Sequence, residues 1–115
     1  MIDAWITQLR KGVLEFALLL ALERGENYGY EIVSTLREVE GLAVSESTVY
    51  PILVRLRGEG YLRSRDAASA SGPQRKYFSL TGKGRLRLAE MKAYWPVLCR
   101  SLEHLQKRKT KEQGR

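Results

Sequence analysis

The chain has 115 residues, 43% of them hydrophobic and 29% charged, and 20 lysines and arginines against 13 acids give it a net charge of +7. This length allows one domain with a modest core, and the composition excludes a generally disordered chain. The positive charge favours a polyanionic partner such as nucleic acid, and solubility alone is the competing explanation.

The cysteine and histidine content excludes further classes of protein. A single cysteine, Cys99, cannot form an intrachain disulfide, which fits a reducing, cytoplasmic location. With a single histidine, His104, it cannot build a zinc site of histidines and cysteines, so neither a metal nor a cofactor is expected. The most apolar run, Val13–Leu22, contains Glu15 and is half as long as a membrane span, and no signal peptide is expected.

Three helices are expected in the first half of the chain. The first runs from Asp3 or Thr7 to Arg24, and Gly25 then begins a turn. The second covers residues 28–40 and the third residues 45–59, with short connections between them. The second helix carries an apolar stripe of helical period, formed by Ile32, Val33, Leu36 and Val39. This arrangement belongs to the helix-turn-helix group.

A β-hairpin is expected next. Tyr61–Arg65 and Arg75–Thr81 are short alternating segments, and the segment between them, residues 66–74, is small, polar and contains Gly-Pro. We expect that middle segment to be a long, mobile tip. Three helices followed by a basic hairpin give the element order of a winged helix, a mostly helical α+β fold.

A long helix is expected over Gly82–Leu105, with Thr81 as its cap and a kink at Pro96. Its apolar residues follow a heptad pattern that predicts a dimerisation seam of Leu88, Met91, Trp95, Leu98, Leu102 and Leu105. Residues 106–115 are charged and lack apolar anchors, so a disordered basic tail is expected. Cys99 lies beside the seam, where an inert packed thiol is favoured over a redox switch.

The third helix has two unlike faces. One side of its helical wheel gathers Val49, Ile52, Leu53 and Leu56, which predicts the core face. The opposite line is made of small residues, Ser47, Pro51, Val54 and Gly58, flanked by Tyr50 and Arg57 on one edge and Thr48 and Arg55 on the other. Such a thin ridge with basic and hydroxyl flanks suits the major groove of DNA. The alternative is an ordinary surface helix that tolerates a proline.

Further predictions concern the start of the third helix and the basic residues of the helices and the hairpin. Ser45 or Ser47 is expected to accept a hydrogen bond from a free N–H of the third helix. Arg55 is four residues from Glu59 and can pair with it instead of with phosphate. The hairpin offers Arg63, Arg65, Arg75 and Lys76 as phosphate contacts, or as a solvated basic face. Arg10 and Lys11 are weaker candidates, for which simple solvation is favoured.

Aromatic residues at both ends of the chain raise a further hypothesis. Trp95 falls on the heptad seam, which favours dimer packing. The alternative is an effector pocket at a dimer interface, lined by Trp5, Tyr94 and Trp95 and suited to flat hydrophobic ligands.

The segments "NYGYEI", "SESTVYPILVRLRGEGYL" and "SGPQRKYFSLTGKG" together resemble the PadR-type transcriptional regulators of bacteria, over about Leu9 to Trp95. The resemblance is to the smaller subfamily with a single C-terminal helix. It implies a homodimeric winged-helix DNA-binding protein, usually a repressor released by a small effector. It also implies that the third helix is the recognition helix, with Ser47, Thr48, Tyr50 and Pro51 facing DNA, and that Arg75 and Lys76 lie in the basic wing.

The resulting expectation is a winged-helix DNA-binding domain at residues 1–81, a dimerisation helix at 82–105 and a tail at 106–115. The DNA-facing residues of the recognition helix are expected to be Ser45, Ser47, Thr48, Tyr50, Pro51, Val54, Arg55 and Arg57. The partner is double-stranded DNA with an inverted-repeat operator, and no membrane is involved. A protein–protein interaction module is the alternative function, although its interface would favour aromatic anchors over small residues. No enzymatic motif is present in the sequence.

Overall fold

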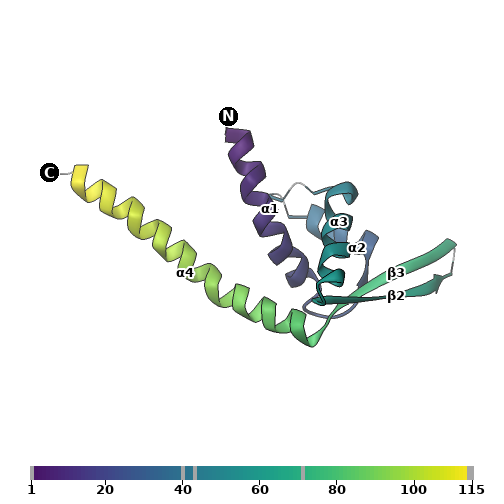
Figure 1. Cartoon of the computed structure of the whole chain (residues 1–115). Coiled ribbons are helices and arrows are strands. Elements are labelled where there is room, and N and C mark those ends of the chain that lie inside the picture. Colours follow the sequence, from purple (N-terminus) through teal and green to yellow (C-terminus); the bar gives the residue numbers. More distant parts are fainter. Residues whose placement is uncertain (1, 40, 43, 71, 114–115) are drawn as a thin grey trace.

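The structure is a computed structural model. It describes residues 2–39, 41–42, 44–70 and 72–113, with residues 109–113 described by their backbone alone. Three helices pack together at its centre, a hairpin projects from one side, and a long C-terminal helix runs away on the other (Figure 1). This mostly helical α+β architecture confirms the expected winged-helix order.

The three central helices are α1 (Ile2–Ala21), α2 (Gly29–Arg37) and α3 (Glu46–Gly58). Helix α1 ends before the predicted Arg24, because the chain turns over residues 22–25. The Gly25 N–H donates to the Leu22 carbonyl at 3.2 Å, and Gly25 has φ 149°, a conformation that favours glycine.

Helix α2 is shorter than expected. It ends at Arg37, and the predicted end at Glu40 lies outside the described residues. Ile32, Val33 and Leu36 are buried as the apolar stripe predicts. The prediction for Val39 is wrong: it follows the end of the helix and is 53% exposed.

The sheet has the order β1-β3-β2 and is antiparallel, with strands β1 (Asn27–Tyr28), β2 (Leu62–Ser69) and β3 (Gly72–Leu80). Strands β2 and β3 form the wing. The expected long tip is wrong, since Ser69 pairs with Gly72 and the strands continue almost to the turn. Ladder hydrogen bonds use backbone groups and need no apolar side chains, so small polar residues continue the strands. Ser71, also assigned to that tip, lies outside the described residues.

The core is assembled from all of these elements. Its largest fully buried side chains share an exposure below 2% and come from every central helix and the sheet: Phe78, Leu18, Leu19, Leu22, Ile32, Leu53, Leu56, Val33 and Val49. Burying one leucine or isoleucine side chain contributes roughly 1.5–3 kcal/mol, so this cluster fixes α3 against the other two helices.

The start of helix α4 (Gly82–Gln113) is joined to the domain rather than separate from it. The predicted cap is confirmed, because Thr81 Oγ1 accepts a hydrogen bond from the Gly84 N–H at 3.0 Å and donates one to the Gly60 carbonyl at 2.6 Å. Leu88 is only 3% exposed and lies in the core, and Met91 packs against that core. The assignment of Leu88 to a dimer seam is therefore corrected: it stabilises its own chain.

Beyond that junction α4 leaves the domain. Leu102 and Leu105 are 55% and 57% exposed, and the helix continues past Leu105 to Gln113. The described part of the segment expected to be disordered is thus helical, because helix hydrogen bonds are local and do not require apolar anchors. Pro51 and Pro96 both lie inside continuous helices.

Candidate nucleic-acid interface

The outer face of α3 has the composition that its helical wheel predicts. Val49, Leu53 and Leu56 are buried and Ile52 is half-buried. The opposite line, Ser47, Pro51, Val54 and Gly58, is exposed throughout, and so are Thr48, Tyr50 and Arg55. The predicted division of α3 into a core face and a small-residue ridge is confirmed.

The start of α3 differs from the expected cap. Ser45 occupies the N-cap position with φ −134° and ψ 165°, but its side chain makes no capping hydrogen bond. Its Oγ lies 3.0 Å from Ser47 Oγ and 3.2 Å from Thr48 Oγ1 instead. A cluster of hydroxyl groups therefore stands at the exposed start of the helix.

The two arginines on the flanks of α3 are held by protein groups. Arg55 donates to Glu59 Oε1 at 2.9 Å and to Glu15 Oε1 at 3.1 Å. Arg57 is half-buried and donates to Ser64 Oγ at 3.2 Å on the wing. The predicted Arg55–Glu59 pair is confirmed, and Arg55 links α3 to α1 rather than extending from it as a free cation.

Glu15 is the centre of a wider network. It accepts from Arg87 Nε at 2.5 Å in addition to Arg55, and Arg87 also donates to the Tyr61 hydroxyl at 3.1 Å. Burial raises the pKa of Glu15, but the hydrogen bonds and charges of Arg87 and Arg55 lower it further, so the net pKa lies below its usual value. One carboxylate thus joins α1, α3 and α4.

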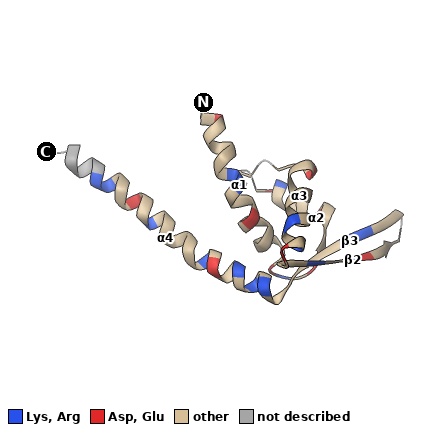
Figure 2. Ribbon diagram, viewed as in Figure 1, with Lys and Arg blue, Asp and Glu red and all other residues tan. Residues whose placement is uncertain are grey.

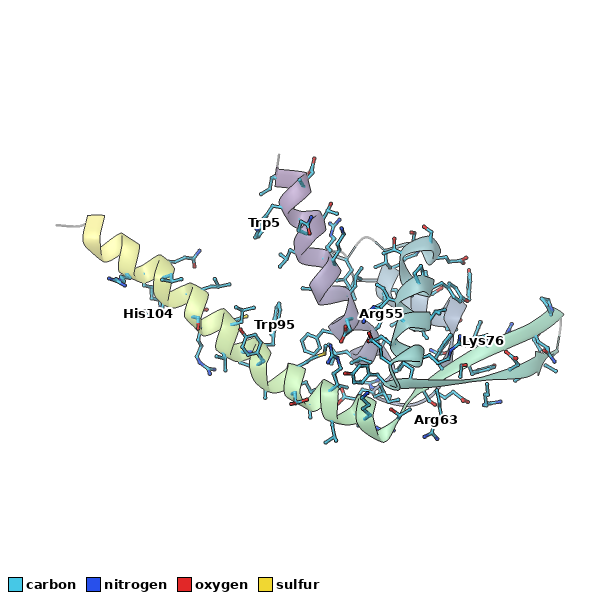
Figure 3. The ribbon with its side chains drawn as sticks, viewed as in Figure 1. Trp5, Arg55, Arg63, Lys76, Trp95 and His104 are labelled. Atoms are coloured by element: carbon cyan, nitrogen blue, oxygen red, sulfur yellow. The ribbon has the colours of Figure 1, made fainter. Side chains whose placement is uncertain are left out.

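The basic residues of the wing do not share one face. Lys76 lies two residues before the buried Phe78 on β3, so its side chain is on the same face of the strand, the face toward the core. Arg63, Arg65 and Arg75 lie on the other face, and Figure 3 shows Arg63 and Lys76 on opposite sides of the hairpin. The four cations predicted as phosphate contacts are thus divided three to one between the two faces of the hairpin.

Most of these wing cations also have partners. Arg65 forms two hydrogen bonds with Glu26, at 2.6 and 2.8 Å, and Lys76 lies 3.2 Å from Asp66. Arg75 stacks over the Tyr28 ring at 4.4 Å. Among the residues that the structure describes, Arg63 has no ionic partner.

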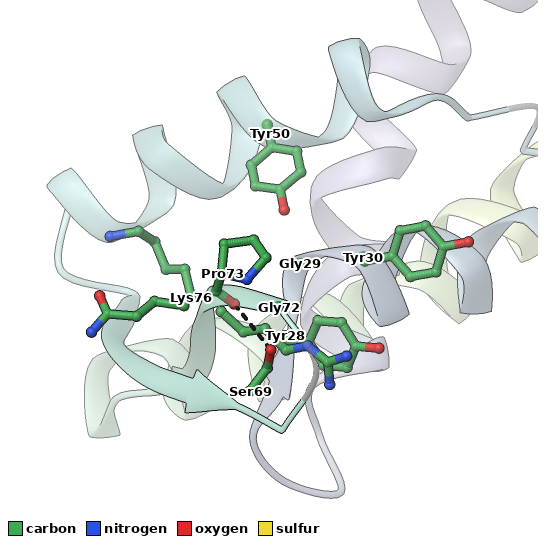
Figure 4. A pocket seen from close by; sticks show the side chains of 10 residues that line it. Tyr28, Gly29, Tyr30, Tyr50, Ser69, Gly72, Pro73 and Lys76 are labelled. Carbon is green, nitrogen blue, oxygen red and sulfur yellow. Dashed lines mark hydrogen bonds between the residues drawn. The ribbon is translucent and has the colours of Figure 1, made fainter.

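A groove of about 490 Å³ lies between α3, the start of α2 and the wing (Figure 4). Tyr28, Gly29 and Tyr30 line it together with Tyr50, Arg75 and Lys76. Those first three residues were not among the predicted site residues, although a glycine between two tyrosines at a predicted helix start was a visible signal.

Helix α1 contributes less to this surface than its candidates indicated. Arg10 donates from Nε to the Gly41 carbonyl at 3.2 Å, and neither Arg10 nor Lys11 lines the groove. Lysines and arginines also follow α4, as Figure 2 shows, so the positive charge is not confined to α3 and the wing.

A second, apolar cavity of about 260 Å³ lies between α1 and α4. Tyr94 and Trp95 line it with Leu9, Val13, Phe16, Met91 and Leu98. The Phe16 and Trp95 rings are 5.9 Å apart at 52°. Trp5 does not line this cavity, which corrects its assignment within one chain; it is 61% exposed on the side of α1 that faces α4 (Figure 3).

Metal sites and membrane spans are not found in the described parts of the chain. No cluster of three or more histidine, cysteine or acidic residues there is arranged to hold a metal ion. None of the helices described is long and apolar enough to span a membrane.

Together, the helix-turn-helix core, the exposed ridge and the hairpin define a winged-helix protein. Residues 18–90, more than half of the chain, match the model of the transcriptional regulator PadR-like family. The chain belongs to this family of transcriptional regulators, which agrees with the expectation that it is not an enzyme.

The relatives support this assignment. The chain is 33% identical over 78 residues to the negative transcriptional regulator PadR of Bacillus subtilis, which is 66% of this chain but only 43% of that protein. The crystal structure of a PadR family transcriptional regulator from Eggerthella lenta has a TM-score of 0.81 and 33% identity, over 91% of both chains. That of B. subtilis PadR in complex with operator DNA has a TM-score of 0.63 and 32% identity, over 69% of this chain and 45% of that one.

Proposed function

We propose that this chain is a homodimeric transcriptional repressor that binds an inverted-repeat operator through α3 and is released by a small hydrophobic effector. The observation that carries the proposal is the exposed ridge of small residues on α3 beside the groove with Arg75 and Lys76. Small side chains let a helix enter the major groove, while its flanks reach phosphates. Two relatives support a DNA-binding repressor: one is named as a negative transcriptional regulator, and the structure of another is in complex with operator DNA.

Dimer formation is proposed from the apolar residues that one chain leaves uncovered. Trp5 and Leu9 on α1 and Leu102 and Leu105 on α4 are each about half exposed, and Trp95 is 41% exposed. A second copy would cover them. A two-fold axis would then set two α3 helices about one DNA turn apart, ≈ 34–36 Å, which explains why an inverted repeat is expected.

Effector release is proposed from the apolar cavity between α1 and α4. Its lining by Phe16, Tyr94 and Trp95 suits a flat hydrophobic molecule. A ligand that binds better to a dimer geometry unsuited to the operator lowers DNA affinity, at most by the ratio of its own affinities for the two geometries. Titration of an aromatic dye against tryptophan fluorescence tests this step; dye binding without any change in DNA affinity would contradict it.

The DNA-binding step is tested with duplexes selected from a random pool. Fluorescence anisotropy should give an affinity that falls steeply with salt, and Thr48→Ala on α3 should weaken it about tenfold, the range of one lost hydrogen bond. Thr35→Ala, an exposed threonine on α2, is the matched control and should bind as the unsubstituted protein does. Salt-independent binding without sequence preference would instead favour a protein–protein interaction module.

A further inference from the structure

Gly29 and Tyr50 are in close contact between two helices. Gly29 is the first residue of α2 and is buried, and Tyr50 on α3 is 37% exposed. A Cβ atom built on Gly29 would lie 2.2 Å from the Tyr50 hydroxyl oxygen and 2.6 Å from its Cζ. The missing side chain of Gly29 therefore leaves the space in which the end of the Tyr50 ring lies.

This contact sets the direction of the Tyr50 hydroxyl. The ring points from α3 across the groove toward Gly29 and Pro73, as Figure 4 shows, and both of those residues line the groove. Val54, on the ridge itself, is 49% exposed and faces outward. Tyr50 is thus directed to the side of the ridge, toward the wing.

Two cations line the groove around that hydroxyl, although one of them, Lys76, pairs with Asp66 at 3.2 Å. Its described lining includes the cations Arg75 and Lys76 and no carboxylate. Arg75 is held there by the Tyr28 ring, 4.4 Å away. A neutral phenol can donate a hydrogen bond to a phosphate oxygen, and an arginine can do so beside it.

We infer that Tyr50 binds a backbone phosphate of the operator in this groove, where Arg75 and Lys76 add positive charge to the lining, that Tyr50 does not read a base, and that Gly29 is the positioning residue that directs Tyr50 there. The inference rests on the proposed function. It separates the two kinds of contact on α3: the small ridge lies against base edges, and the tyrosine on its flank fixes the height and orientation of the helix on the phosphate backbone.

The phosphate assignment is tested with Tyr50→Phe, which removes the hydroxyl alone. Affinity is measured for the preferred duplex and for a set of duplexes that each carry one changed base pair. A lost phosphate contact weakens all of them equally, by roughly tenfold, because every sequence has the same phosphate. A loss confined to one base-pair position would overturn the assignment, since that is the signature of base readout.

The role of Gly29 is tested with Gly29→Ala, alone and together with Tyr50→Ala. The added methyl group displaces the ring, so Gly29→Ala should weaken binding by about as much as Tyr50→Phe and leave the slope of affinity against salt unchanged. In the Tyr50→Ala background it should have no further effect, because there is no ring to displace. Titration at high protein concentration gives the active fraction, so any unfolded protein is excluded from the comparison.

Gly82→Ala is the matched control. Gly82 is also the first residue of a helix, and a Cβ atom there meets nothing within 4 Å, so this variant should bind as the unsubstituted protein does. The positioning role of Gly29 would be overturned if Gly29→Ala bound DNA with normal affinity. It would also be overturned if Gly29→Ala weakened DNA binding by the same factor with and without the Tyr50 ring. Absence of any selective DNA binding by the unsubstituted protein would overturn the proposed function as well as this inference. The contrary outcomes named for Tyr50→Phe and Gly29→Ala would overturn only the inference and leave the proposed function standing.

Discussion

Glu15→Gln should reveal how strongly one carboxylate holds α3 in place. Glu15 is the only acid in the apolar run of α1, and its side chain is 12% exposed. Its two oxygens accept from Arg55 on α3 and from Arg87 on α4. Glutamine keeps the shape of the side chain but removes the charge and one of the two acceptors.

The expected loss of stability depends on how exposed Arg55 and Arg87 are. A hydrogen bond to a charged group contributes about 1.5–3 kcal/mol, and the arginine side chains, 48% and 37% exposed, are screened enough by water to place each bond at the lower end. We expect a loss of roughly 2 kcal/mol. The unfolding entropy is about 2.1 cal/mol/K per residue, so in a chain of 115 residues this loss of free energy lowers Tm by about 8 °C.

The assay is urea unfolding followed by circular dichroism at a fixed protein concentration, because dimer formation would make stability depend on concentration. Glu23→Gln is the matched control. Glu23 pairs with Lys92 on α4, but both side chains are nearly half exposed, so its loss should stay below about 1 kcal/mol.

The pH dependence of stability is a second test of the role of Glu15. The pKa of Glu15 in the folded chain is below its usual value of 4.5. Its stabilisation is therefore complete above the unfolded pKa and is lost as pH falls through the folded pKa. The stability difference between the original chain and Glu15→Gln should be largest near neutral pH and shrink below pH 4.5. A difference no larger than that of Glu23→Gln, or one that does not change with pH, would refute the assigned role.

Three further substitutions test the junctions of the fold by thermal unfolding. Gly84→Ala should destabilise by several kcal/mol, since its Cβ would lie 2.1 Å from the Tyr61 carbonyl oxygen, which cannot move like a side chain; wild-type stability would contradict this packing. Thr81→Ala removes the cap of α4 and should cost about 1 kcal/mol, and no change would mean that the cap hydrogen bond is unimportant. Leu53→Ala, at a fully buried position, should cost about 2–5 kcal/mol, and a loss below 1 kcal/mol would contradict its place in the core.

Local patterns were enough to predict the two faces of α3. The period of a helix alone separates Val49, Leu53 and Leu56 from the exposed residues of α3, because positions on a helix face depend only on spacing along the chain. The cap at Thr81 and the antiparallel wing follow from equally local signals. The sequence therefore predicted the order of the four helices and the hairpin, the inner and outer faces of α3 and, through its motifs, the family. It did not predict strand β1, whose two residues pair with β3 from a distant part of the chain.

Contacts between distant segments were decided by the tertiary structure alone. Glu15 meets Arg55 and Arg87 across 40 and 72 positions of sequence, and Gly29 meets Tyr50 across two helices. Leu88 continues a heptad pattern yet is buried in its own chain, because the first turns of α4 pack on the core. A periodic pattern gathers residues on one face of a helix but does not specify what packs against that face, since that depends on how elements far apart in the chain come together in space.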